Sequence, residues 1–210
     1  PRDDKVLSAN EVRDILAHQV VVEEKVDGAN VGFSVDEQGS LRAQNRGTFL
    51  SPEACHPQFK QLFRWLEPRC DALADALFPD LMLFGEWCYA VHNVRYTKLT
   101  DWFLAFDVYD RSRGEFWGAA RRDELVHALG LALVPRLAAG RFDLGRIKCL
   151  LGQSKLSDGP AEGLYVRRDE GNRLVARAKL VRPEFVQGIE EHWSGRTLRT
   201  NLLTGGVAWH

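Results

Sequence analysis

The sequence of 210 residues lacks any apolar run that approaches the roughly 20 residues a helix needs to span a membrane. It also shows no amino-terminal signal peptide. The chain begins at Pro1, so the sequence leaves open whether a segment precedes that residue. We therefore expect a cytoplasmic protein with no membrane partner.

Cysteine is scarce, and its spacing is irregular. No Cys-x-x-Cys pair occurs, and no Cys and His residues stand at the spacing of metal ligands. This pattern argues against a zinc site and favours the reduced, half-buried thiols of a cytoplasmic protein. These thiols belong to Cys55, Cys70, Cys88 and Cys149.

An excess of charge of either sign is also lacking, because 28 Lys and Arg stand against 29 Asp and Glu. Dedicated nucleic-acid binders are usually basic, so the net charge of −1 argues against that class. The balance is uneven along the chain, however. Residues 141–182 hold ten Lys and Arg against five Asp and Glu, a local charge of +5 that leaves −6 for the remainder.

Hydrophobic residues make up 45% of the chain, enough for a sizeable core, and no linker or repeat divides it. We therefore predict one domain over residues 1–210. Several β-type runs with few helices between them predict an α+β fold with mainly antiparallel sheets. The expected strands are 20–25, 31–35, 41–45, 81–84, 102–109, 163–168 and 173–181. Helices are expected after a capping-box pattern at 8–11, at 59–78 with an interruption at Pro68, at 121–129 and at 183–193, and a surface loop at 152–160.

A short motif, Lys25-Val-Asp27-Gly28, directly follows the first predicted strand. A lysine at the end of a buried strand, before a tight turn, is a candidate nucleophile. The alternative is a solvated surface lysine beside a turn glycine. By itself the pattern decides nothing, because it occurs by chance in roughly one chain of this length in twenty.

What strengthens the motif is an ordered series of short motifs at the ends of, or within, the later predicted strands. Arg177 and Lys179, for example, lie two positions apart and therefore project from the same face of their strand. The series comprises Asn45-Arg46-Gly47, Phe84-Gly85-Glu86-Trp87, Phe106-Asp107, Glu162-Gly163 and Arg177-Ala178-Lys179.

In this order the motifs resemble those of the covalent nucleotidyltransferase superfamily, which comprises ATP-dependent DNA and RNA ligases and mRNA capping enzymes. Residues 85–92, 105–110 and 179–185 are similar to bacterial ATP-dependent RNA ligases of the RNA ligase 2 type. The resemblance covers roughly residues 20–193. It implies an α+β, ATP-grasp-like adenylation domain in which ATP lies between two mainly antiparallel sheets flanked by helices. About 30 residues follow Lys179, too few for the five-stranded OB-fold of many relatives.

The resemblance also implies a reaction. A lysine, here Lys25, attacks the α-phosphorus of ATP, passes AMP to a 5′-phosphate end, and a 3′-OH then displaces AMP and seals the strand. The implied catalytic residues are Lys25, Lys179 and Glu162. The implied nucleotide contacts are Glu23 with the adenine amine, Arg46 with ribose or the 5′-phosphate, Phe106 as the adenine stacking face, and Lys25, Glu86, Glu162, Arg177 and Lys179. Mg²⁺ or Mn²⁺ is implied at Asp27, Glu86 and Glu162.

Several of these roles have plain alternatives. Glu23 could simply be solvated at its strand end, and Asp27 could be an ordinary turn residue. Phe103 competes with Phe106 for the stacking role, because a strand phenylalanine is usually in the core. Many relatives carry lysine at the position of Arg177. Arginine keeps the positive charge but replaces the ammonium group with a planar guanidinium fork. His92 is either near the site or structural.

The expected partners are RNA or RNA/DNA nicked ends, together with a kinase or phosphatase that heals such ends. Two other functions stay open. The first is an ATP-dependent DNA ligase with the same chemistry, and the second is a non-catalytic module that binds nucleic-acid ends. The sequence leaves open whether the substrate is single-stranded or a nicked duplex.

Overall fold

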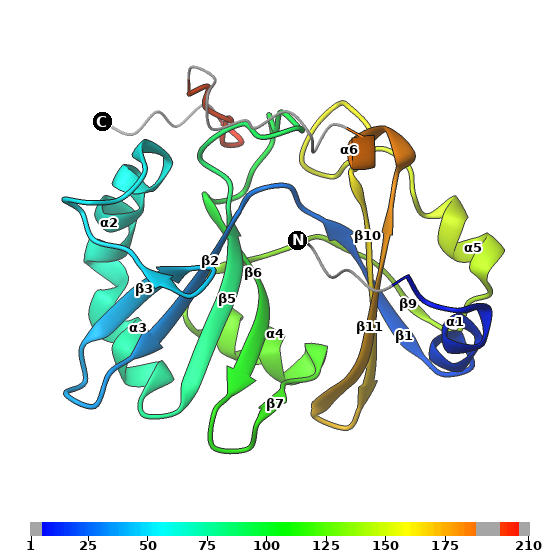
Figure 1. Cartoon of the computed structure of the whole chain (residues 1–210), viewed down its shortest axis with the longest axis horizontal. Helices are drawn as coiled ribbons and strands as arrows, with labels where there is room; N and C mark the ends of the chain where they lie inside the picture. Colours follow the sequence, from blue (N-terminus) through cyan, green and yellow to red (C-terminus); the bar gives the residue numbers. More distant parts are fainter. Residues whose placement is uncertain (1–5, 188–197, 206–210) are drawn as a thin grey trace.

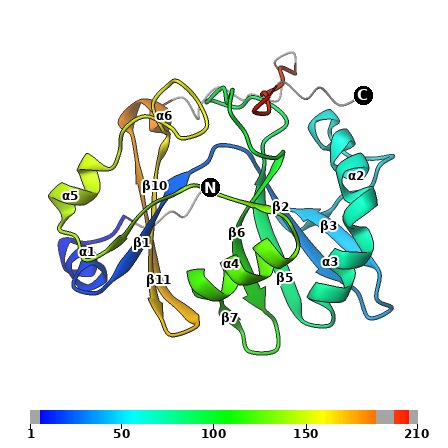
Figure 2. The same cartoon turned by 180° about the vertical axis from the view of Figure 1, so that it is seen from behind.

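A computed structural model describes residues 6–187 and 198–205. Two β-sheets face one another, and most of the helices lie on their outer sides (Figures 1 and 2). Every strand pairing is antiparallel except the short pairing of β8 with β6. The predicted α+β fold with mainly antiparallel sheets is therefore confirmed.

The smaller sheet has the strand order β11-β10-β1-β9. Its strands are β1 (Val20–Lys25), β9 (Arg136–Gly140), β10 (Gly163–Glu170) and β11 (Arg173–Val181). The larger sheet has the order β4-β3-β2-β5-β6-β7, with β8 beside β6. Its strands are β2 (Ala29–Val35), β3 (Leu41–Asn45), β4 (Thr48–Phe49), β5 (Leu81–Trp87), β6 (Phe103–Asp110), β7 (Glu115–Phe116) and β8 (Ala132–Leu133).

The helices begin and end largely where local sequence signals place them. Ser8 forms the predicted capping box with Glu11 at the start of α1. The expected helix over 59–78 is divided, because Pro68 lacks an amide donor and lies in a 3₁₀ turn. The helices are α1 (Ala9–Leu16), α2 (Lys60–Leu66), α3 (Cys70–Leu77), α4 (Ala119–Ala128), α5 (Leu144–Cys149) and α6 (Pro183–Gln187), with 3₁₀ turns at Pro57–Phe59 and Glu67–Arg69.

Some local features differ from the expectations. The sequence does not predict β9 and α5, because each is short and its hydrophobic residues show only weak periodicity. The segment at 152–160 is more than a surface loop, since Ser154, Leu156 and Ser157 are buried in it. The last predicted helix starts at Pro183 as expected, but residues 188–193 lie outside the described residues. No described helix is both long and apolar enough to cross a membrane.

Each sheet packs one face against helices. On the larger sheet Phe33 and Phe103 pack with Trp65 of α2, with ring centroids 4.9–6.0 Å apart. On the smaller sheet a second core contains Val22 of β1 and Ile147 of α5. Because side chains alternate along a strand, Glu23 and Lys25 project from the opposite face of β1 to Val22, toward the larger sheet.

Candidate active site

Lys25 is the last residue of β1, and the β1–β10 register places it opposite Gly163. Its Nζ lies 2.5 Å from Oε2 of Glu162, the residue just before β10, which is 6% exposed. A side chain at Gly163 is excluded, because its Cβ would lie 2.4 Å from the Leu180 carbonyl oxygen on β11. The sheet register thus brings together a lysine and a carboxylate that are 137 residues apart.

The turn after Lys25 is held by the segment that follows β5. Oδ2 of Asp27 accepts hydrogen bonds from the amides of Asn93 at 2.6 Å and Val94 at 2.9 Å. The Asp27 amide donates to the Tyr96 hydroxyl at 2.8 Å. A Cβ at Gly28 would lie 3.0 Å from the Trp87 carbonyl oxygen, so the turn approaches the end of β5 closely. Oδ2 of Asp27 therefore ties the turn to residues 93–94, and its role toward a metal stays a prediction.

Glu86 on β5 is a half-buried residue opposite Asn30 of β2, and the Oε2 atom of its carboxyl is buried. Its Oε2 has no hydrogen-bond partner among the described residues. Burial raises the pKa of Glu86 to about 8, although the charge of Lys25 acts in the opposite direction. A buried carboxyl oxygen without a partner, beside a lysine and a second carboxylate, is arranged to meet a ligand.

Arg46 lies at the exposed tip of the β3–β4 turn with a φ of +48°, and its charge favours ionised Glu86. The turn is anchored to the larger sheet, because Asn45 donates its side-chain amide to the Asn30 carbonyl at 2.6 Å. Arg46 is therefore held near Glu86, although nothing in the sequence of the turn specifies that neighbour.

Lys179 and Arg177 project from β11 on the same face as Tyr165 and Glu23, as their register shows. Both are exposed. Nη1 of Arg177 bonds Oδ2 of Asp107 at 3.0 Å, and its guanidinium lies 4.6 Å from the Phe116 ring centroid. Arg177 thus has protein partners across the gap between the sheets.

The Glu23 side chain has a buried protein partner. The side chain is 1% exposed, and both carboxylate oxygens accept from Arg122 of α4, at 2.5 and 3.2 Å. This burial excludes simple solvation of the strand end. The contact with the adenine amine stays a prediction, and it would compete with this ion pair.

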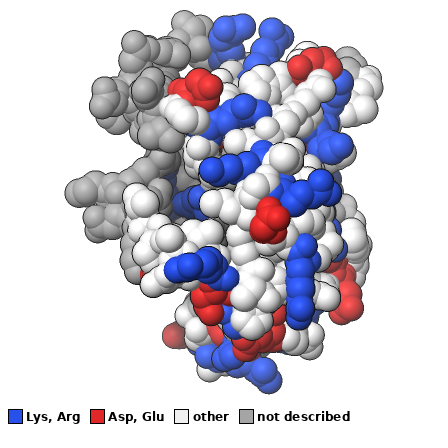
Figure 3. All heavy atoms as spheres, turned by 90° about the vertical axis from the view of Figure 1, so that its right-hand side faces the viewer, with Lys and Arg blue, Asp and Glu red and all other residues white. Residues whose placement is uncertain are grey.

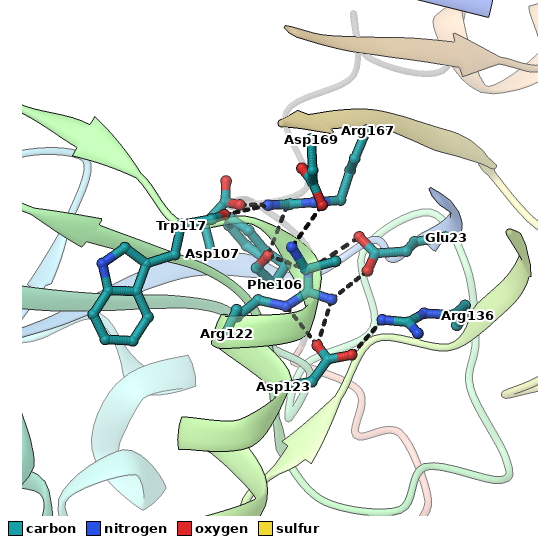
Figure 4. A network of polar contacts seen from close by, with 10 residues as sticks. Glu23, Phe106, Asp107, Trp117, Arg122, Asp123, Arg136, Arg167 and Asp169 are labelled. Carbon is teal, nitrogen blue, oxygen red and sulfur yellow. Dashed lines mark hydrogen bonds and ion pairs between the residues drawn. The ribbon is translucent and has the colours of Figure 1, made fainter. Parts of the chain in front are cut away.

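Phe106 is half-buried on β6, whereas its rival Phe103 is completely buried in the aromatic core. The Phe106 carbonyl accepts from Arg122 and Arg167, two buried residues of the polar network drawn in Figure 4. Sequence reasoning missed Arg122. A signal existed, because Ala119, Arg122 and Val126 have the i, i+3, i+7 spacing of a buried helix stripe.

The carboxylates of the site are also the candidate ligands of a metal ion. No group of three or more His, Cys, Asp or Glu residues within the described ranges could enclose an ion. Mg²⁺, however, is usually held by one or two carboxylates together with water and substrate phosphates. Glu86, with its unpartnered oxygen, and Glu162 fit that mode of binding. Asp27 has Oδ2 already occupied by two amides.

Residues 18–181 match a family model of RNA ligase. The chain belongs to the RNA ligase family. Among solved structures, this family member is similar to the Naegleria gruberi RNA ligase with PPi, with a TM-score of 0.67 and 20% identity over 89% of this chain and 57% of that one. A mutant of the same Naegleria ligase with ATP and Mn gives a TM-score of 0.64 and 18% identity over 84% of this chain and 54% of that one.

The RNA ligase family member described here thus spans a little over half the length of those Naegleria chains. At this identity the structural likeness establishes the shared fold, with two antiparallel sheets flanked by helices. No curated protein sequence matches the chain.

Proposed function

We propose that this chain is an ATP-dependent RNA ligase of the cytoplasm that works through a covalent AMP adduct on Lys25. AMP then passes to a 5′-phosphate RNA end, and a 3′-OH end displaces AMP to seal the break. The observation that carries the proposal is the pairing of Lys25 with Glu162 at 2.5 Å, beside Glu86, whose buried Oε2 has no partner among the described residues.

The first step forms a bond between Nζ of Lys25 and the α-phosphorus and breaks the bond to the β-phosphate oxygen, which leaves as pyrophosphate. Nζ attacks only as a neutral amine, so the ammonium must first give a proton to water. Glu162 holds Nζ in place before the nucleotide enters. Lys179, exposed on the same side of the smaller sheet, supplies positive charge to the phosphate oxygens.

A divalent cation, Mg²⁺ or Mn²⁺, supplies further neutralisation of phosphate charge when it is bound. Glu86 and Glu162 are the residues that would hold it. A mutant of the Naegleria ligase has a structure with ATP and Mn, which supports the use of a divalent cation. Arg46 and Phe106 are proposed to contact the nucleotide, and Arg177 to add positive charge at its edge.

The RNA substrate is supported by family membership and by the distribution of charge. Figure 3 shows that Lys and Arg side chains are more widespread than Asp and Glu on the side that carries α1 and α5. Arg141, Arg146 and Lys148 are exposed in that region. Positive charge of this kind contributes sequence-independent affinity for a phosphate backbone. An end-healing kinase or phosphatase would supply the 5′-phosphate and 3′-OH ends.

The adduct is tested by incubation with α-labelled ATP and Mg²⁺, followed by acid. We expect an acid-stable, protein-bound AMP that is lost in Lys25→Ala and retained in Lys148→Ala, an exposed lysine on α5. No label on the wild type would refute the enzymatic proposal and favour a non-catalytic end-binding module. Labelling by GTP in place of ATP would indicate capping-like chemistry.

The substrate is tested with a matched series of nicks. A nick with an RNA 3′-OH end should be sealed faster than an all-DNA nick of the same sequence. Equal rates, or faster sealing of the DNA nick, would favour the alternative of an ATP-dependent DNA ligase.

A further inference from the structure

Strand β6 contains a bulge at Phe106. The β5–β6 register pairs Gly85 with Ala105 and then Phe84 with Asp107, so Phe106 is an extra residue with no opposite partner. A bulge of this kind removes a residue from the regular ladder and redirects its side chain, and bulges are common beside active sites. The carbonyl of Phe106 is accordingly available to groups outside the sheet.

Two arginines from different elements donate to that one carbonyl. Nη1 of Arg122, on α4, lies 2.7 Å from the oxygen, and Nη1 of Arg167, on β10, lies 3.0 Å from it. Figure 4 shows both guanidinium groups converging on Phe106. Arg122 is 1% exposed and Arg167 is 0% exposed, so neither could easily exchange these bonds for bonds to water.

Each arginine also forms an ion pair that joins the two halves of the molecule. Arg122 reaches from α4, which packs beside the larger sheet, to Glu23 on the smaller sheet. Arg167 reaches from the smaller sheet to Asp107 on the larger one. We call Arg122 and Arg167, with Glu23 and Asp107, the double-arginine clamp.

The clamp is rigid for a chemical reason. A guanidinium is a planar fork with donors in fixed directions, so its bonds to a carboxylate and to the Phe106 carbonyl cannot be adjusted separately. Burial disfavours the charged guanidinium of Arg122, but the carboxylates of Glu23 and Asp123 outweigh it and raise its pKa. The bulge and the spacing of the two sheets are therefore fixed together.

We propose that Arg122 and Arg167 are positioning residues for the base of the nucleotide: they hold the bulge in the conformation that presents the Phe106 ring to adenine. This inference rests on the proposed function, in which Phe106 is the stacking face. Without the clamp, β6 is free to return to a regular register, and a shift of one residue turns a side chain to the other face of a sheet.

The test compares two ligands of the full chain without metal, so that binding is measured and no adduct forms. ATP carries the base, whereas inorganic tripolyphosphate carries only the phosphates. The variant is Arg122→Lys, which keeps a positive charge opposite Glu23 but cannot form the fork. The matched control is Arg121→Lys, the neighbour on α4, whose guanidinium stacks on Trp117 at 3.6 Å.

We expect Arg122→Lys to weaken ATP binding about tenfold in titration calorimetry, equivalent to about 1.4 kcal/mol. Tripolyphosphate binding should change less than about twofold, and Arg121→Lys should change neither. In a Phe106→Leu background, Arg122→Lys should cause no further loss of ATP affinity, because the two residues act as one unit. The proposal would be overturned if Arg122→Lys weakened the binding of ATP and tripolyphosphate equally, or weakened neither. It would also be overturned if the losses of ATP affinity from Arg122→Lys and Phe106→Leu were fully additive.

A second variant guards against a failure to fold. If urea unfolding shows that Arg122→Lys is not native, Glu23→Gln with Arg122→Gln replaces the ion pair by neutral amides and leaves no buried charge unpaired. The same selective loss of ATP affinity is expected, and an unchanged ATP affinity would overturn the proposal. Because the readout is equilibrium binding, the absence of an AMP adduct would refute the ligase proposal without deciding the role of the clamp.

Discussion

Glu86 gives a prediction whose size follows from the structure. Its Oε2 is buried, and desolvation raises the pKa of the carboxyl from 4.5 to about 8. A folded-state pKa above the unfolded value means that the native protein binds the extra proton more tightly. The stability from this proton is fully present below pH 4.5 and is lost as the pH rises through about 8. Glu86→Gln, which is neutral at every pH, should remove this dependence.

The expected change in stability follows from the difference between the pKa of Glu86 in the folded chain and its ordinary value. At about 1.36 kcal/mol per pKa unit, the whole displacement is equivalent to about 5 kcal/mol. Of this, about 3 kcal/mol should be lost by the wild type between about pH 5 and about pH 8, because the unfolded chain has already released this proton near pH 4.5 whereas the folded chain keeps it until about pH 8. The free energy of unfolding of Glu86→Gln should therefore rise by about 3 kcal/mol relative to that of the wild type between about pH 5 and about pH 8.

The assay is urea unfolding at a series of pH values without nucleotide or metal, followed by tryptophan fluorescence. Glu53→Gln, at an exposed position, is the control, and its free energy of unfolding should change with pH as that of the wild type does. Equal slopes of free energy against urea would show that the unfolded states are comparable. If Glu86→Gln and the wild type keep a constant difference, within about 1 kcal/mol, the reasoning about the buried carboxyl is refuted.

Three further predictions concern the site and the core. Lys179→Ala should slow AMP adduct formation about 100-fold or more while urea unfolding stays within about 0.5 kcal/mol of the wild type, and normal labelling would disprove its role. Asp27→Ala should lower the free energy of unfolding by about 1–3 kcal/mol, because two amides at residues 93–94 lose their acceptor, and Asp27→Asn should restore part of it. Leu62→Ala, at 0% exposure, should cost about 2–5 kcal/mol, whereas Leu144→Ala, at 43%, should cost less than about 1 kcal/mol. A similar cost at both leucines would contradict the packing.

Much of the fold could be predicted from local sequence. The β-branched run before Lys25 forms β1, and the Ser8 capping box starts α1. Short elements such as β9 and α5 could not be predicted, because a few residues do not establish a period. The order of the motifs predicted a lysine and carboxylates at strand ends, and the sheet registers bring Lys25 and Glu162 into contact.

The partner of Glu23 could not be predicted from the sequence, for a physical reason. Alternation along β1 correctly placed Glu23 on the side of Lys25, but a residue's partner is set by what folds against that side. The partner, Arg122, is 99 residues away on a helix whose charge pattern looks like that of a solvated surface.

The sequence by itself therefore determined most of the strands that bear the proposed site residues, because backbone propensities and side-chain alternation act locally. Only the tertiary structure decided how the two sheets are joined. The bulge at Phe106, the burial that raises the pKa of Glu86 and the double-arginine clamp depend on residues far apart in the chain. Burial and ion pairing are properties of that packing, and no single segment encodes them.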